Sequence, residues 1–203
     1  MKLFYASASP FVRMVLVTAA ELGIADRIER IDGATTPIDA NPALAETNPV
    51  AKLPTLVTDD GDALYDSRVI CEYLVDVAGN ETMLPTKGRA RWSALRRLAL
   101  VNGILDAAVL RRYEAAMRPA EKQWQGWDEA QRLKVVRALD ELEREVDQLG
   151  SGATLGAIGV ACALGYLDFR FDHENWRDGR PKLAAWYEDW AKRPSMTATV
   201  PTG

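Results

Sequence analysis

The sequence predicts an α/β domain followed by an all-helical domain, and three observations lead to this fold class. Strand-like and helix-like segments alternate up to about residue 79, whereas only helical patterns occur from residue 89 onward. Between them lies a turn-rich segment that contains glycine, asparagine and proline. We therefore divide the 203-residue chain into an α/β domain (1–79), a linker (80–88) and a helical domain (89–203) that holds all six tryptophans.

The first domain reads as β-α-β followed by β-β-α. The expected strands cover residues 2–5, 27–31, 55–57 and 63–65. Ser9 before Pro10 is a typical N-cap with proline at the first helical position, and Gly23 marks the end of that helix. Asp66 or Ser67 begins the second helix. The polar segment between the second and third strands is expected to be a loop.

Apolar stripes at helical spacing define the second domain. The expected helices cover residues 89–117, 128–149, 154–171 and a segment that begins at Pro181. The helix 154–171 is almost entirely apolar, so we expect it at the centre of the bundle. Its start lacks a full capping box because Ala157 stands where an acid would bond back to Thr154, and we expect a weaker cap.

Charge and residue counts exclude several function classes. The net charge of −4 argues against nucleic acid or an anionic membrane as partner. His173 is the only histidine, and Cys71 and Cys162 form no C-x-x-C pair, so a metal site and a disulfide framework are not expected. No apolar run reaches the roughly 18 residues that span a bilayer. We expect a cytoplasmic protein without metal or cofactor.

Ser9 is the leading candidate for chemistry. It stands at the start of the first helix, where free backbone N–H groups and the positive end of the helix dipole attract an anion. A free thiol has a pKa near 8.5, and such a helix start together with a hydroxyl donor stabilises its thiolate. Two alternatives stay open at this stage. Ser9 is only a helix cap, or Ser7 supplies the hydroxyl.

Three short motifs and one apolar segment, in this order, resemble the cytosolic glutathione S-transferases. They are Ser9-Pro10-Phe11-Val12-Arg13, Lys52-Leu53-Pro54-Thr55-Leu56, Asp66-Ser67 and the apolar segment 161–167. The resemblance covers the whole chain and is greatest for a bacterial branch with an N-terminal S-P-F-V-R segment. It implies a thioredoxin-like βαβ-ββα domain followed by a helical bundle. It also implies a homodimer, with glutathione as co-substrate.

The resemblance also implies roles for residues of the first domain. The Ser9 hydroxyl would donate a hydrogen bond to the glutathione sulfur. The backbone of Leu53 would bind the cysteinyl part of the tripeptide beside a cis Pro54, and Lys52 would approach the glycyl carboxylate. A strand-starting trans proline and a solvated lysine are the alternatives.

Two further groups of residues complete the implied site. Asp66 and Ser67 would hold the γ-glutamyl end, a role compatible with capping their helix. The pocket for a small hydrophobic electrophile would be lined by Phe11, Asp106, Val109 and Tyr113. The helical spacing of the last three is equally typical of packing or of a subunit contact.

Departures from the family pattern and unassigned charges leave further expectations. Val50 and Ala51 precede Lys52 where glycine is common, so we expect that loop to follow a different path. Arg13 either pairs with an acid of the helical domain or lies on the surface. The arginines at 111, 112 and 118 form either a solvated basic face or a site for an acidic co-substrate.

Two functions of different classes follow from these observations. The first is a glutathione transferase that conjugates glutathione to a soft electrophile. The alternative is a non-catalytic binding or regulatory protein that kept the fold. A thiol–disulfide enzyme is disfavoured, because a serine at position 9 cannot form a mixed disulfide.

Overall fold

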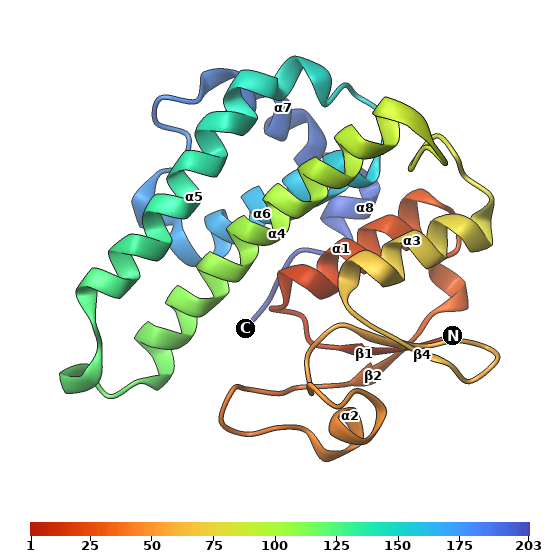
Figure 1. Cartoon of the computed structure of the whole chain (residues 1–203), viewed down its shortest axis with the longest axis horizontal. Coiled ribbons are helices and arrows are strands. Elements are labelled where there is room, and N and C mark those ends of the chain that lie inside the picture. The colour runs from red at the N-terminus through yellow and green to blue at the C-terminus, as the bar shows by residue number, and fades with distance from the viewer.

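The computed structural model describes residues 1–203 as an α/β domain joined to a helical domain (Figure 1). The first domain contains β1 (Lys2–Tyr5), α1 (Pro10–Glu21), β2 (Glu29–Asp32), α2 (Pro42–Thr47), β3 (Thr55–Val57), β4 (Ala63–Leu64) and α3 (Ser67–Ala78). Its four strands form one mixed sheet in the order β2-β1-β3-β4. Strand β1 runs parallel to β2 and antiparallel to β3, which pairs antiparallel with β4. This is the thioredoxin-like arrangement that the sequence predicts.

The short helix α2 contradicts the expectation of a continuous loop between β2 and β3. The Oδ1 atom of Asn41 accepts a hydrogen bond from the Leu44 N–H at 3.1 Å, and Pro42 occupies the first turn. Leu44 is fully buried and anchors the helix to the domain. An asparagine followed by proline therefore begins α2 in the same way that Ser9 and Pro10 begin α1.

The second domain is entirely helical. It contains α4 (Gly88–Met117), α5 (Gln125–Glu145), α6 (Leu155–Phe171), α7 (Pro181–Ala191) and α8 (Pro194–Thr197). Helix α6 is buried at the centre of the bundle, as predicted, whereas the short α8 was not predicted. The expected weak cap is still made, because the Thr154 hydroxyl accepts from the Ala157 N–H at 3.2 Å. None of these helices is long and apolar enough to cross a membrane.

The two domains share one hydrophobic core, in which α1 packs against both α3 and α6. Arg13 of α1 lies inside this contact with only 7% of its surface exposed. Its Nη2 donates to the Met196 carbonyl at 3.0 Å, and its Nε donates to the Thr199 hydroxyl at 3.4 Å. Both expectations for Arg13 were wrong, since it neither pairs with an acid nor lies on the surface. It instead fastens α1 to α8 and to the residues that directly follow it.

We predict that Gly165→Ala destabilises the fold by about 1–3 kcal/mol through overpacking. A Cβ at Gly165 would overlap the Arg13 guanidinium and lie 2.8 Å from the Tyr187 hydroxyl. Gly103→Ala is the matched control, because Gly103 lies in α4 with nothing within 4 Å of such a Cβ. Alanine there should stabilise the helix by about 0.5–1 kcal/mol. Urea unfolding of both variants measures the difference, and equal stabilities would contradict the interdomain contact.

Candidate functional site

The turn between β1 and α1 presents an available hydroxyl. Ser9 is the N-cap of α1, and its Oγ accepts a hydrogen bond from the Val12 N–H at 3.3 Å. The hydroxyl proton of Ser9 bonds to no group of the chain, and neither does the N–H of Phe11 in the first turn. Ser9 can therefore cap α1 and donate a hydrogen bond to a ligand at the same time. An anion placed at this turn would meet two free donors and the positive end of α1.

Ser7, the alternative hydroxyl, is already engaged. Its Oγ donates to the Thr202 carbonyl at 2.7 Å. This bond draws the segment 198–203 over the turn, and Gly203 comes to lie beside Ala8. Of the two serines that the sequence left open, only Ser9 has a free hydroxyl proton.

The loop before β3 leaves the backbone N–H and C=O of Leu53 unpaired. The Leu53–Pro54 bond is cis, as the family resemblance implied. The N–H and C=O of Leu53 take part in no hydrogen bond within the chain. Asn48, which is fully buried, holds the loop by donating to the Lys52 carbonyl at 3.2 Å. This asparagine was not singled out from the sequence, so its anchoring role was missed.

Ala51 takes the backbone conformation that glycine favours, with φ at 47°. The expectation of a different loop path rested on the absence of glycine here. The structure shows that Ala51 enters the left-handed region all the same. Lys52, the next residue, is exposed and carries no salt bridge.

The start of α3 forms a second group of free donors. Asp66 caps the helix by accepting from the Arg68 N–H at 3.0 Å, and its carboxylate also pairs with the Arg68 guanidinium at 3.1 Å. Partial burial acts to raise the pKa of Asp66, but the hydrogen bonds from Arg68 outweigh it and leave the pKa below its usual value. Ser67 is buried, and its hydroxyl bonds to no group of the chain.

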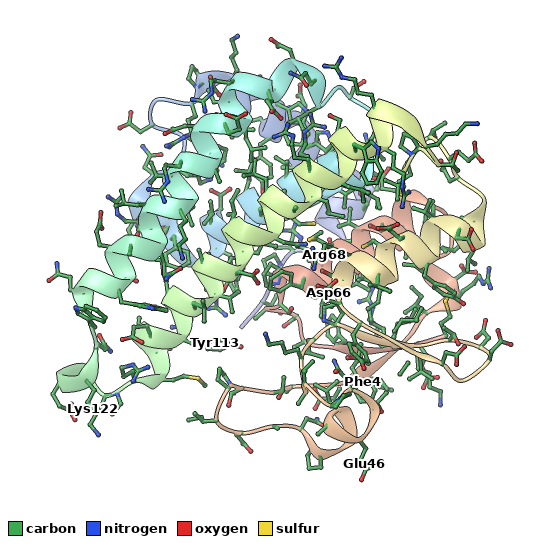
Figure 2. All side chains as sticks on the ribbon, in the orientation of Figure 1. Phe4, Glu46, Asp66, Arg68, Tyr113 and Lys122 are labelled. Carbon is green, nitrogen blue, oxygen red and sulfur yellow. The ribbon has the colours of Figure 1, made fainter.

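Helix α4 brings charge from the second domain to this region. Burial raises the pKa of Asp106, while the nearby cations Lys52 and Arg68 oppose the rise and Asp66 adds to it. These interactions place Asp106 across the domain boundary from the Lys52 loop and the start of α3. Figure 2 shows Asp66 and Arg68 at that start, close to α4.

The remaining residues expected in the pocket lie on α1 and α4. Phe11 and Val109 are partly buried against the shared core. Tyr113 projects from α4 toward the first domain (Figure 2), and partial burial raises the pKa of its phenol. Leu110, in contrast, is 46% exposed.

The expected basic face on α4 is not a free cluster. Arg111 is buried between Asp128 at 2.9 Å and Glu174 at 2.5 Å, and Arg118 pairs with Glu114. Arg112 alone forms no ion pair. No group of three His, Cys, Asp or Glu side chains is arranged to hold a metal ion.

The structure combines a thioredoxin-like domain, which has unpaired hydrogen-bond donors at the starts of two helices, with a helical bundle. This is the combination that the resemblance to the glutathione S-transferases implied. The glutathione S-transferase N-terminal domain family matches residues 8–77, and the glutathione S-transferase C-terminal domain family matches residues 104–189. The uncharacterized GST-like protein YibF of Escherichia coli K12 is 36% identical over 99% of this chain and 98% of its own length. The chain belongs to the glutathione S-transferase family.

Solved structures agree over the full length of the chain. A glutathione transferase family member from Pseudomonas fluorescens Pf-5, with bound glutathione, is 46% identical and superposes with a TM-score of 0.97 over 100% of this chain and 99% of that chain. A Pf-5 family member with bound S-(propanoic acid)-glutathione gives 45% identity, full coverage of both chains and a TM-score of 0.92. A glutathione S-transferase from Methylobacillus flagellatus KT with glutathione bound is 34% identical, with 99% coverage of both chains and a TM-score of 0.89.

We predict that Asp66→Ala lowers the free energy of unfolding at pH 7 by about 0.5–2 kcal/mol, the usual cost of a lost N-cap. Because the folded pKa of Asp66 is depressed, its charge contributes stability above the unfolded pKa of about 3.9. That contribution is lost as the pH falls through the folded pKa. The difference from the wild type should therefore shrink between pH 6 and pH 3 in denaturant unfolding.

Asp66→Asn is the control for this prediction. Asparagine caps a helix about as well as aspartate but carries no charge to titrate. It should keep most of the stability at pH 7, with a flatter dependence on pH. A cost for Asp66→Ala that does not change with pH would contradict the assigned role of the carboxylate.

Proposed function

We propose that this protein is a glutathione transferase in which the Ser9 hydroxyl donates a hydrogen bond to the glutathione sulfur. The observation that carries the proposal is the free hydroxyl proton of Ser9 at the positive end of α1. A relative that is 46% identical over the full chain has been solved with glutathione bound. Ser7 is the poorer candidate because its hydroxyl is bonded to Thr202.

The tripeptide would be held by groups that the fold leaves free. The unpaired N–H and C=O of Leu53 would bond to the backbone of the cysteinyl residue, as an added strand does at a sheet edge. Lys52 would lie near the glycyl carboxylate. The free hydroxyl of Ser67 at the start of α3 would bind the γ-glutamyl carboxylate, and Asp66 its ammonium group.

The reaction is a nucleophilic attack by sulfur. The thiol loses its proton to solvent, and the resulting thiolate is stabilised by Ser9 and by the first turn of α1. The sulfur then forms a bond to an electrophilic carbon while the bond to the leaving group breaks, and the leaving group departs with the electron pair. No imidazole base is needed, and the single histidine, His173, is exposed.

The electrophile pocket would lie between the domains. Phe11 and Val109 supply apolar surface, and Tyr113 and Asp106 supply polar groups at its wall. The second substrate is then small and at least partly hydrophobic. A relative solved with S-(propanoic acid)-glutathione supports a site that also accepts glutathione substituted at sulfur.

We predict that Ser9→Ala lowers kcat for conjugation of a generic aromatic electrophile about 10- to 100-fold. A hydrogen bond to a charged group contributes about 1.5–3 kcal/mol, and each 1.4 kcal/mol is a factor of ten. Losing it raises the pKa of the bound thiol, so the pH–rate profile should move to higher pH. Binding of glutathione, measured by calorimetry, should change far less than kcat.

Ser7→Ala is the matched control and should keep the pH–rate profile of the wild type. If Ser9→Ala keeps full activity and Ser7→Ala loses it, the assignment of the hydroxyl is wrong. Glutathione binding without turnover of any electrophile would instead favour the non-catalytic binding protein.

We further propose a homodimer of cytoplasmic location, as the family resemblance implies. A groove of about 500 Å³ between α3 and α4 supports the dimer. Val69 at its edge is 48% exposed, and Trp92, one turn before groove-lining Leu95, is 68% exposed. We expect light scattering to give twice the chain mass of 22.4 kDa, and Val69→Glu to reduce it to one chain. A wild-type mass of one chain would contradict the proposal.

A further inference from the structure

Four arginines of the helical domain pair with no Asp or Glu side chain, and two of them, Arg112 and Arg170, are also partly buried, whereas Arg89 and Arg137 are exposed. Most arginines of this domain are paired, including Arg111 with Asp128 and Glu174. Arg112 on α4 makes no ion pair and no side-chain hydrogen bond. Arg170 on α6 pairs with no Asp or Glu side chain, and its Nη1 donates to an oxygen of Gly203, the last residue, at 3.0 Å. Both side chains are only partly exposed, so water solvates them incompletely.

Arg170 lies close to the turn that carries Ser9. Its partner Gly203 is packed beside Ala8, the residue directly before Ser9. The bond from Ser7 to Thr202 holds the same segment over that turn. The Arg170 guanidinium is therefore linked through Gly203 to the turn at which a sulfur bound to Ser9 would lie.

A buried phenol points to the same place. Tyr166 lies one turn before Arg170 on α6 and is only 4% exposed, and the Arg170 side chain lies beside its hydroxyl. Burial raises the pKa of Tyr166 to about 12, an effect opposed by the nearby Arg170 and Arg112 and increased by Tyr113. The Tyr166 hydroxyl thus has both arginines and a second phenol around it.

We propose that Arg112, Arg170, Tyr113 and Tyr166 form a carboxylate-binding subsite of the electrophile pocket. This inference rests on the proposed function, and it names the substrate class: a small electrophile that carries a carboxylate at the end remote from the reacting carbon. The planar fork of a guanidinium matches a carboxylate, and phenol hydroxyls donate to the remaining lone pairs. The apolar surface of Phe11 and Val109 would then contact the carbon chain between sulfur and carboxylate.

The carboxylates near this subsite are already paired with other residues. Asp168 of α6 is bonded to Trp176 at 2.7 Å and to Arg177 at 2.6 Å. Glu174 is held by Arg111. Neither arginine of the subsite is therefore paired with an Asp or Glu side chain.

The test compares two ligands that differ only in charge at one end. They are S-(2-carboxyethyl)glutathione and its neutral amide, S-(2-carbamoylethyl)glutathione, with unmodified glutathione as reference. We expect calorimetry to show that the wild-type protein binds the acid at least about tenfold more tightly than the amide. Arg112→Gln and Arg170→Gln should each reduce this ratio about fivefold or more while the Kd of glutathione stays unchanged. Tyr166→Phe should reduce it less, because it removes a hydroxyl donor and no charge.

Arg137→Gln is the matched control, because Arg137 is an exposed arginine of α5 without an ion pair. It makes the same change in net charge away from the subsite and should leave the ratio unchanged. Equal affinity of the wild type for acid and amide, with glutathione still bound, would overturn the subsite and leave the proposed function intact. Failure to bind glutathione itself would overturn both. A ratio lowered equally by Arg137→Gln would show a general charge effect and would also overturn the subsite.

Discussion

The geometry of the site depends on the first turn of α1. Ser9 must accept from Val12 to begin the helix, and this leaves its proton free to donate. Pro10 has no N–H, so the first free amide of the helix is that of Phe11. Two contacts made far along the chain hold this turn in place. Arg13 bonds to Met196 beneath it, and Ser7 bonds to Thr202 above it.

The two domains contribute different things to the site. The first domain presents backbone and hydroxyl donors that its own secondary structure leaves unpaired, at Ser9, Leu53 and Ser67. These suit a ligand with a constant shape, such as a tripeptide. The helical domain adds side chains, namely Tyr113, Arg112 and Arg170, which can set the choice of second substrate. Both sets of groups are therefore available to bind a ligand.

Much of the fold was predictable because local signals decided it. The Ser9–Pro10 start, the apolar run of α6 and the strands β1 and β3 were placed within a residue of their observed ends. The helix α2 was missed, although Asn41 and Pro42 carry the same signal as Ser9 and Pro10.

The site was less predictable, because its details depend on distant contacts. Ser7 could not be set aside without Thr202, 195 residues away, and only folding shows which arginines find carboxylates. Tyr166 and Arg170 gave no signal beyond their spacing on an apolar helix.

The position of the sulfur is the most direct test of this account. A crystal structure of the protein with bound glutathione would show it without any assumption about the electrophile. We predict a sulfur within about 3.5 Å of the Ser9 Oγ, at the tip of α1, with Leu53 bonded to the cysteinyl backbone. A sulfur out of reach of Ser9, or bound to a Ser7 that has released Thr202, would contradict it.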